Sequence, residues 1–232
     1  MIIRKMMAVC LLTAMGMGAK AQFYVQGGLN LANITKTNSG GTEDNNMLPT
    51  FNAGVMARFG LSDMFDLESG LLLNGKGSKA ETYFTNSNDD NYVKTKFNPL
   101  YLELPVNAVV KFPIAAQSKS NVFLHAGPYV AMGIAGKSKV DARIIGVSSS
   151  SSNDIKFNDD DPTTSQQEDA GYDKLKRFDY GLNFGGGVDF GKFLLKANYG
   201  VGMAKINSTE SDNSKNDKNK YRTLSISVGI HL

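Results

Sequence analysis

Six charged or histidine residues lie in segments where every second residue, counted from them, is mostly polar: Arg58, Glu68, Glu103, Lys111, His125 and Lys196. Opposite charges that share an enclosed space can form buried ion pairs, or they can line a narrow path for ions or protons. His125, with Glu103 earlier in the chain, is also a candidate general base. A histidine with no partnered nucleophile is more often a hydrogen-bonded structural group. We therefore predict a structural polar network and no catalytic residue.

Other candidate sites are weaker. Gly185-Gly186-Gly187 lies within a strand pattern and does not open a helix, so it is not a phosphate-binding loop. The cluster Asp159-Asp160-Asp161 lacks the spaced ligands of a calcium site. Cys10 is the only cysteine, which excludes disulfides and thiolate metal sites from the rest of the chain. We expect no metal and no cofactor.

These residues must be positioned by strands, because apolar and polar residues alternate with a period of two. In residues 221–232, Leu224, Ile226 and Val228 fall on one face, and Thr223, Ser225 and Ser227 fall on the other. The same alternation predicts seven further strands, at about residues 23–32, 50–60, 64–76, 98–112, 121–136, 178–190 and 193–206.

The connections between these strands alternate between long and short. Long polar segments occur at about residues 35–46, 77–96, 137–176 and 207–220, and short ones lie between them. Short turns at one rim and long loops at the other are typical of outer-membrane barrels. We predict an all-β fold: an eight-stranded antiparallel up-and-down transmembrane β-barrel with short periplasmic turns and long extracellular loops. Its interior would be too narrow for an open pore.

The alternative is a soluble lipocalin-like barrel or sandwich, whose apolar face points inward. The charged opposite face and the alternation of loop lengths favour the membrane barrel. In that barrel the aromatic residues near strand ends form interfacial girdles, and these are Phe23, Phe59, Phe65, Phe112, Phe178, Phe190, Phe193 and Tyr221. Pro105 and Pro128 cannot donate to a strand ladder, so each is expected at a bulge or a rim.

The N-terminal residues 1–21 have the pattern of a cleaved signal peptide. Arg4 and Lys5 precede a short apolar run, and Ala19-Lys20-Ala21 matches a small-x-small cleavage site. Residues 22–232 would then form a single barrel domain. The chain has 25 basic and 22 acidic residues, so removing three basic residues with the signal peptide leaves a balanced charge. That balance gives no footprint for nucleic acid.

Several segments resemble the PorT-like outer-membrane β-barrel family of Bacteroidetes-type, Gram-negative bacteria. They include Tyr101-Leu102-Glu103-Leu104-Pro105 and Ala126-Gly127-Pro128-Tyr129, together with residues 28–34, 67–72 and 179–190. They are spread over nearly all of residues 22–232. The resemblance implies the same barrel fold, and it suggests an accessory role in protein secretion or envelope assembly.

The expected function is that of a non-enzymatic integral protein of the cell outer membrane, with a role in surface interaction or envelope integrity. The alternatives are the PorT-like secretion factor and, with less support, a lipid-modifying barrel enzyme. The expected partners are outer-membrane lipid, the barrel-assembly machinery during biogenesis, and an unidentified envelope or secretion protein.

Overall fold

The computed structural model describes residues 21–38, 41–44, 47–84, 91–114, 120–157, 174–204, 206 and 219–232, and the side chains of residues 36–44 and 174 are not described. The predicted signal peptide and the cluster Asp159 to Asp161 lie outside these ranges, except for Ala21. Within the described ranges, no helix has the length and apolar character needed to cross a bilayer.

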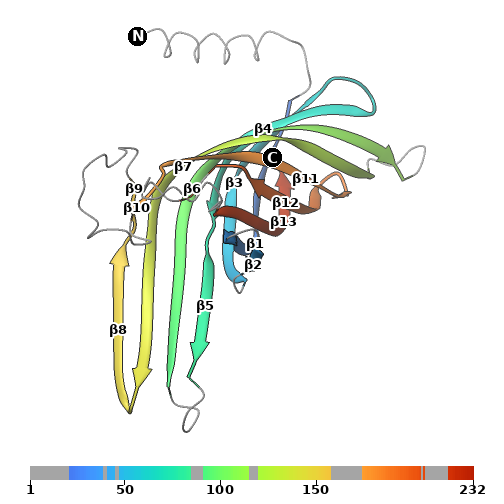
Figure 1. The fold of residues 1–232 in the computed structure, drawn as a ribbon. Coiled ribbons are helices and arrows are strands. Elements are labelled where there is room, and N and C mark those ends of the chain that lie inside the picture. Colours follow the sequence, from blue (N-terminus) through green and yellow to red (C-terminus); the bar gives the residue numbers. More distant parts are fainter. Residues whose placement is uncertain are drawn as a thin grey trace.

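The described part of the chain folds into one 11-stranded sheet and a separate pair of two short parallel strands (Figure 1). The strands are β1 (Ala21–Asn38), β2 (Gly41–Asp44), β3 (Leu48–Gly60), β4 (Phe65–Gly75), β5 (Ser78–Tyr83), β6 (Tyr92–Pro113), β7 (Asn121–Ile144), β8 (Val147–Asp154), β9 (Lys156–Phe157), β10 (Lys174–Leu175), β11 (Phe178–Asp189), β12 (Phe193–Gly202) and β13 (Lys220–His231).

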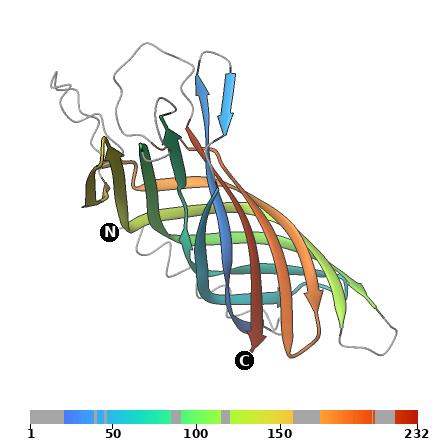
Figure 2. The ribbon, with the colours of Figure 1, turned by 90° about the horizontal axis from the view of Figure 1, so that it is seen from below.

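Eight of these strands close into a ring in the order β1, β3, β4, β6, β7, β11, β12 and β13. All neighbours in the ring are antiparallel, and β13 returns to β1 with Tyr24 opposite His231. Closure leaves the ring without a free edge. The predicted eight-stranded antiparallel up-and-down barrel is confirmed, and Figure 2 shows its strands tilted side by side.

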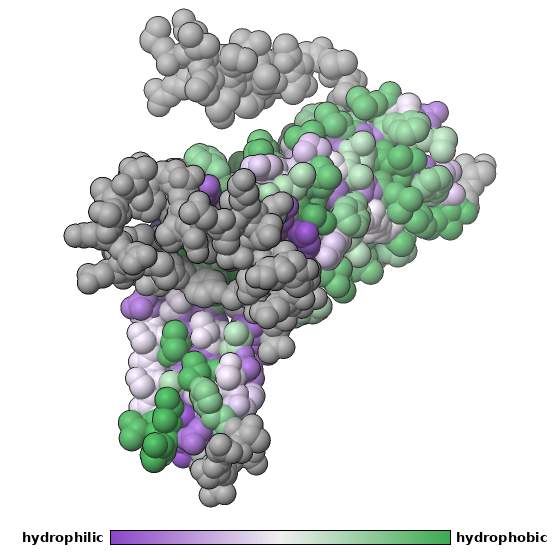
Figure 3. Space-filling model, viewed as in Figure 1, coloured by the Kyte–Doolittle hydropathy of each residue, from purple (hydrophilic) through white to green (hydrophobic). Residues whose placement is uncertain are grey.

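The apolar face of each barrel strand points outward, as predicted for a membrane barrel. Phe51, Val55, Leu124 and Ile226 are about half exposed, whereas the alternating polar residues are buried inside. The space-filling view shows this as apolar cover over the barrel wall (Figure 3). Six of the predicted girdle aromatics gather at the rim of the short turns: Phe23, Phe59, Phe65, Phe112, Phe190 and Phe193. The prediction was wrong for Tyr221, which is 2% exposed and lies inside the barrel rather than in a girdle.

The two strand prolines lie within the barrel wall and not at a rim. Pro105 is opposite Tyr129 and Pro128 is opposite Leu182, with no shift of register at either residue. Instead, the β6–β7 ladder has no pair between Pro105–Tyr129 and Ala108–Ala126, where the missing proline N–H groups leave a local gap. The expectation of a bulge at each proline was wrong. The register shift of β6 and β7 occurs elsewhere, between Leu100 and Tyr101.

Three of the four predicted loops contain further strands. In the first, β1 continues to Asn38 and β2 pairs with its end. Residues 78–83 form β5 against an extended β6, and β7 continues to Ile144 before β8 returns along it. The serine run Ser148–Ser152 lies in β8. A strand can form there without apolar side chains, since its pairing with β7 uses main-chain groups. We call this four-stranded extension the arm: β5, residues 92–99 of β6, residues 135–144 of β7, and β8. It bends away from the direction of the barrel strands (Figure 1).

Candidate functional site

The barrel interior contains buried charged and polar residues along its length, together with two buried apolar clusters. At the rim of the short turns, Tyr24, Met56, Leu72, Val109, Phe123 and Leu194 pack together as a buried cluster. At the opposite mouth, Ile155, Leu175 and Ile206 from the long connections pack on residues of the wall, among them Tyr101, Tyr129 and Tyr221. Main-chain hydrogen bonds hold this cap, from Ile155 N to Gly136 O (3.0 Å) and from Lys176 N to Ile206 O (3.0 Å).

The first charged cluster surrounds Glu68 of β4, whose carboxylate is fully buried. Arg58 Nε lies 2.7 Å from Glu68 Oε2, and the ammonium of Lys196 contacts Glu68 Oε1. Tyr24 donates to the same carboxylate at 2.8 Å, and Asn107 donates at 3.2 Å. Arg58 also reaches Asp189 at 3.3 Å. Two cations thus face two carboxylates, and the carboxylate of Glu68 has a partner on each oxygen.

The second charged cluster surrounds Lys76, which follows β4 and is 2% exposed. Its ammonium lies 2.7 Å from Asp179 Oδ2 and 3.1 Å from Glu103 Oε2. The same nitrogen is 4.2 Å from the ring centroid of Tyr129, 5.3 Å from that of Tyr101 and 5.9 Å from that of Tyr221. Aromatic faces attract a cation. Lys76 is therefore enclosed by two carboxylates and three tyrosine rings.

Amide side chains extend the hydrogen bonding of the Lys76 cluster through Glu103. Asn74 donates to Glu103 at 2.8 Å, and Asn30 donates to Asn74 at 2.7 Å. On the other side, Asn183 donates to Glu103 at 3.2 Å, and Asn198 donates to Asn183 at 3.2 Å. The cavity among these residues is only about 20 Å³, which is room for about one water molecule.

The structure brings three of the six sequence-predicted residues into one cluster, namely Arg58, Glu68 and Lys196. Glu103 belongs to the Lys76 cluster. Lys111 lies apart near the rim, where its ammonium is 2.7 Å from Asp66. His125 is buried, and its Nε2 lies 2.9 Å from Asn198 Oδ1.

Sequence reasoning missed Lys76 and did not select Asp179 or Asp189. Asp179 and Asp189 have the interior parity of β11, so their position was readable from the sequence. Lys76 lies just beyond a strand between two glycines, where alternation gives no direction. Among the described residues, no group of three His, Cys, Asp or Glu side chains is arranged to hold a metal.

The far end of the arm carries exposed apolar side chains. Ile145 and Gly146 form a two-residue turn with φ of 50° and 76°, between Ile144 and Val147. Ile145 is 85% exposed and Val147 is 71% exposed. Figure 3 shows an apolar patch at this end of the arm, whose remaining surface mixes polar and apolar residues. Turns of this kind favour Asn-Gly, since a β-branched residue is strained at positive φ.

The neighbouring hairpin of the arm carries charged and aromatic side chains on its surface. The Tyr83 hydroxyl donates to Glu81 at 3.0 Å, and this hydrogen bond lowers the pKa of the Glu81 carboxyl. Tyr83 also raises the pKa of Lys94, whose ammonium lies 4.6 Å from the ring centroid of Tyr92. Both side chains stay charged near neutral pH.

Comparison with known proteins supports this architecture. Residues 15–208 match the family model described as outer membrane protein beta-barrel domain. The comparison with curated proteins found no match.

Three solved structures share low identity with the chain. Ail, the attachment invasion locus protein of Yersinia pestis, is 14% identical, with a TM-score of 0.39 and coverage of 91% of this chain and 99% of that one. Neisserial surface protein A is 17% identical, with a TM-score of 0.39 and coverage of 90% and 97%. OprG from Pseudomonas aeruginosa is 13% identical, with a TM-score of 0.38 and coverage of 92% and 97%.

The match of the family model covers most of the chain, and the ring of eight strands has its apolar face outward and its charges inside. The chain belongs to the outer membrane protein beta-barrel domain family and is an integral protein of the outer membrane.

Proposed function

We propose that this barrel is a non-enzymatic surface protein that uses the tip of its arm to contact another protein outside the cell. The observation that carries the proposal is Ile145. It is an isoleucine at positive φ, almost fully exposed, at the far end of an arm that extends beyond the barrel mouth. A strained exposed residue is a reason to look for function.

The arm is well suited to present this tip. Its four strands are paired continuously, and the N–H of Ile145 donates to Asn91 Oδ1 at 2.7 Å, so the two hairpins of the arm are connected at their ends. Exposed apolar groups at such a point favour contact with a protein surface. The closed interior supports a role on the surface rather than in transport.

The test is complementation of a deletion strain with wild-type protein, Ile145→Asn and Ile145→Met. Asparagine suits positive φ and preserves the turn, so Ile145→Asn should insert normally and remove only the apolar contact. We expect wild-type protein and Ile145→Met to restore attachment to other cells or surfaces, and Ile145→Asn to lose most of it. Ser149→Asn, on the flank of the arm, is the matched control. Full attachment with Ile145→Asn would contradict the proposal.

The PorT-like role in secretion is the second candidate. Its support is the sequence resemblance, whose segments supply Tyr101, Glu103 and Tyr129 to the barrel interior. These residues build the Lys76 cluster, so the resemblance bears mainly on the wall of the barrel. Loss of secreted proteins from the medium of the deletion strain, restored equally by Ile145→Asn, would favour this second role. A changed lipid profile would favour a lipid-modifying enzyme instead.

A further inference from the structure

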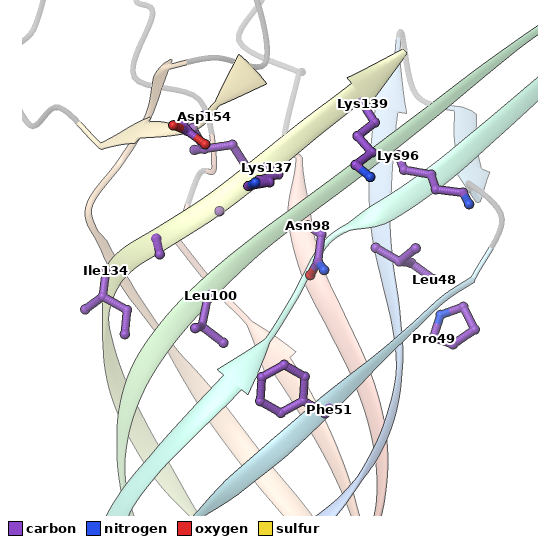
Figure 4. A pocket seen from close by; sticks show the side chains of 13 residues that line it. Leu48, Pro49, Phe51, Lys96, Asn98, Leu100, Ile134, Lys137, Lys139 and Asp154 are labelled. Atoms are coloured by element: carbon purple, nitrogen blue, oxygen red, sulfur yellow. The ribbon is translucent and has the colours of Figure 1, made fainter. Parts of the chain in front are cut away.

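A groove of about 800 Å³ lies on the outside of the barrel, where the arm bends away. One side of it is apolar and comes from the lipid-facing wall: Phe51 of β3, Leu100 of β6 and Ile134 of β7. The other side is basic and comes from the root of the arm: Lys96, Lys137 and Lys139. Figure 4 shows the three lysines above the apolar side chains.

The shift of register explains this change from apolar to basic. Along the barrel, the even-numbered residues of β7 face outward, and Leu100 then pairs with Ala135 while Tyr101 pairs with Gly133. Ile134 is the extra residue. Beyond it the odd-numbered residues share the outward face, so Lys137 and Lys139 continue the lipid-facing surface.

The lysines of the groove lie close to other lysines, which is electrostatically unfavourable. Lys96 has Lys139 opposite it on β7 and Lys79 opposite it on β5. Like charges directly opposite each other destabilise a sheet. In the part of the chain that is described, no carboxylate lies within 4.0 Å of the ammonium of Lys96, Lys137 or Lys139. Asp154 lines the groove opposite Lys137, but this single carboxylate does not balance the charge of the three lysines.

We propose that this groove binds a phosphate-bearing lipid of the outer leaflet, with its phosphate on Lys96, Lys137 and Lys139 and an acyl chain along Phe51, Leu100 and Ile134. The position of the groove fits this ligand, because it lies at the arm end of the barrel wall, where the hydrocarbon layer gives way to headgroups. An anion there would relieve the repulsion between facing lysines. Apolar contact beside cationic groups selects an amphiphile over a free anion.

The experiment is native mass spectrometry of the purified, detergent-solubilised full chain, titrated with diphosphoryl lipid A as the probe. We expect the wild-type protein to retain one lipid, and the triple variant K96Q/K137Q/K139Q to bind at least tenfold more weakly. The matched control is K176Q/K192Q/K220Q, which removes the same charge at exposed or half-buried positions outside the groove and should stay within twofold of wild type. Equal binding by the two triple variants would overturn the proposal.

Two further arms separate lipid from free phosphate. Dephosphorylated lipid A should bind the wild-type protein no better than the phosphorylated lipid binds K96Q/K137Q/K139Q. Millimolar inorganic phosphate should not displace the lipid, and complete displacement would show a site for free anions and contradict lipid binding. The triple variant removes repulsion, so it should fold at least as well as wild type. Heat-dependent gel migration checks this, and the single variant Lys139→Gln provides a second, smaller loss of binding.

Discussion

Glu68 joins more partners than any other carboxylate in the described interior. Its two oxygens accept from Tyr24, Arg58, Asn107 and Lys196. Replacing Glu68 with glutamine keeps the shape but removes the negative charge between two buried cations. Breaking a buried ion pair by removing one partner costs about 3–5 kcal/mol. We expect Glu68→Gln to lower the free energy of unfolding by about this amount, measured by urea titration in detergent micelles or vesicles.

Glu81→Gln provides the control for the loss of a carboxylate. Glu81 lies on the arm, 3.4 Å from Lys79, in contact with solvent. Exposed pairs contribute little to stability. The unfolding midpoint of Glu81→Gln should therefore remain close to that of wild type. If Glu68→Gln unfolded at the wild-type midpoint too, the interior charges would not stabilise the barrel.

At the scale of elements, β11 depends on glycine where aromatic rings of β7 cross it. Gly181, Gly185 and Gly187 lie opposite Tyr129, His125 and Phe123. A Cβ on Gly185 would lie 2.1 Å from Ala197 O and 2.8 Å from His125 Cε1. The close contact with backbone cannot be relieved by a rotamer change. Rings of a neighbouring strand covering glycines are a known stabilising arrangement in sheets.

We expect Gly185→Ala to destabilise the barrel by about 1–3 kcal/mol, the usual cost of overpacking. Gly27→Ala in β1 is the matched control, because its Cβ would lie 3.9 Å from the nearest atom, Asn52 O, which is ordinary contact. Urea titrations of both variants measure the difference. Equal stability of the two variants would show that the wall at Gly185 adapts to a methyl group.

The sequence predicted the strands that have one apolar and one polar face, and it missed the strands that lack this difference. Barrel strands alternate because lipid covers one face and the ion-pair network covers the other, so their number, order and parity were readable. The strand β8 has no apolar face, and the extra residue at Ile134 reverses the parity of β7. The alternation placed the residues of the Glu68 cluster on the interior face. It could not place Lys76, because Lys76 follows the end of β4 and the direction of its side chain is known only from the fold.

For the whole molecule, the two apolar clusters, the buried ion pairs and the small central cavity make the interior a packed core. The mouth is capped by Ile155, Leu175 and Ile206, and the opposite end by residues that include Phe123 and Leu194. An ion would have to displace these apolar groups and then separate cations from carboxylates that are already paired. Eight strands leave just enough space for such side chains.

We therefore expect no stepwise ionic current when the purified protein is inserted into planar lipid bilayers. Heat-dependent gel migration is the control that the inserted protein is folded. If currents occur, Lys196→Gln and Lys192→Gln distinguish their source. Lys196 is inside, on Glu68, and Lys192 lies outside in the turn between β11 and β12. A current whose ion selectivity changes in Lys196→Gln, but not in Lys192→Gln, passes through the interior and would contradict a closed barrel. No current in any of the three proteins leaves the outer surface and the arm as the parts of the molecule that can act on partners.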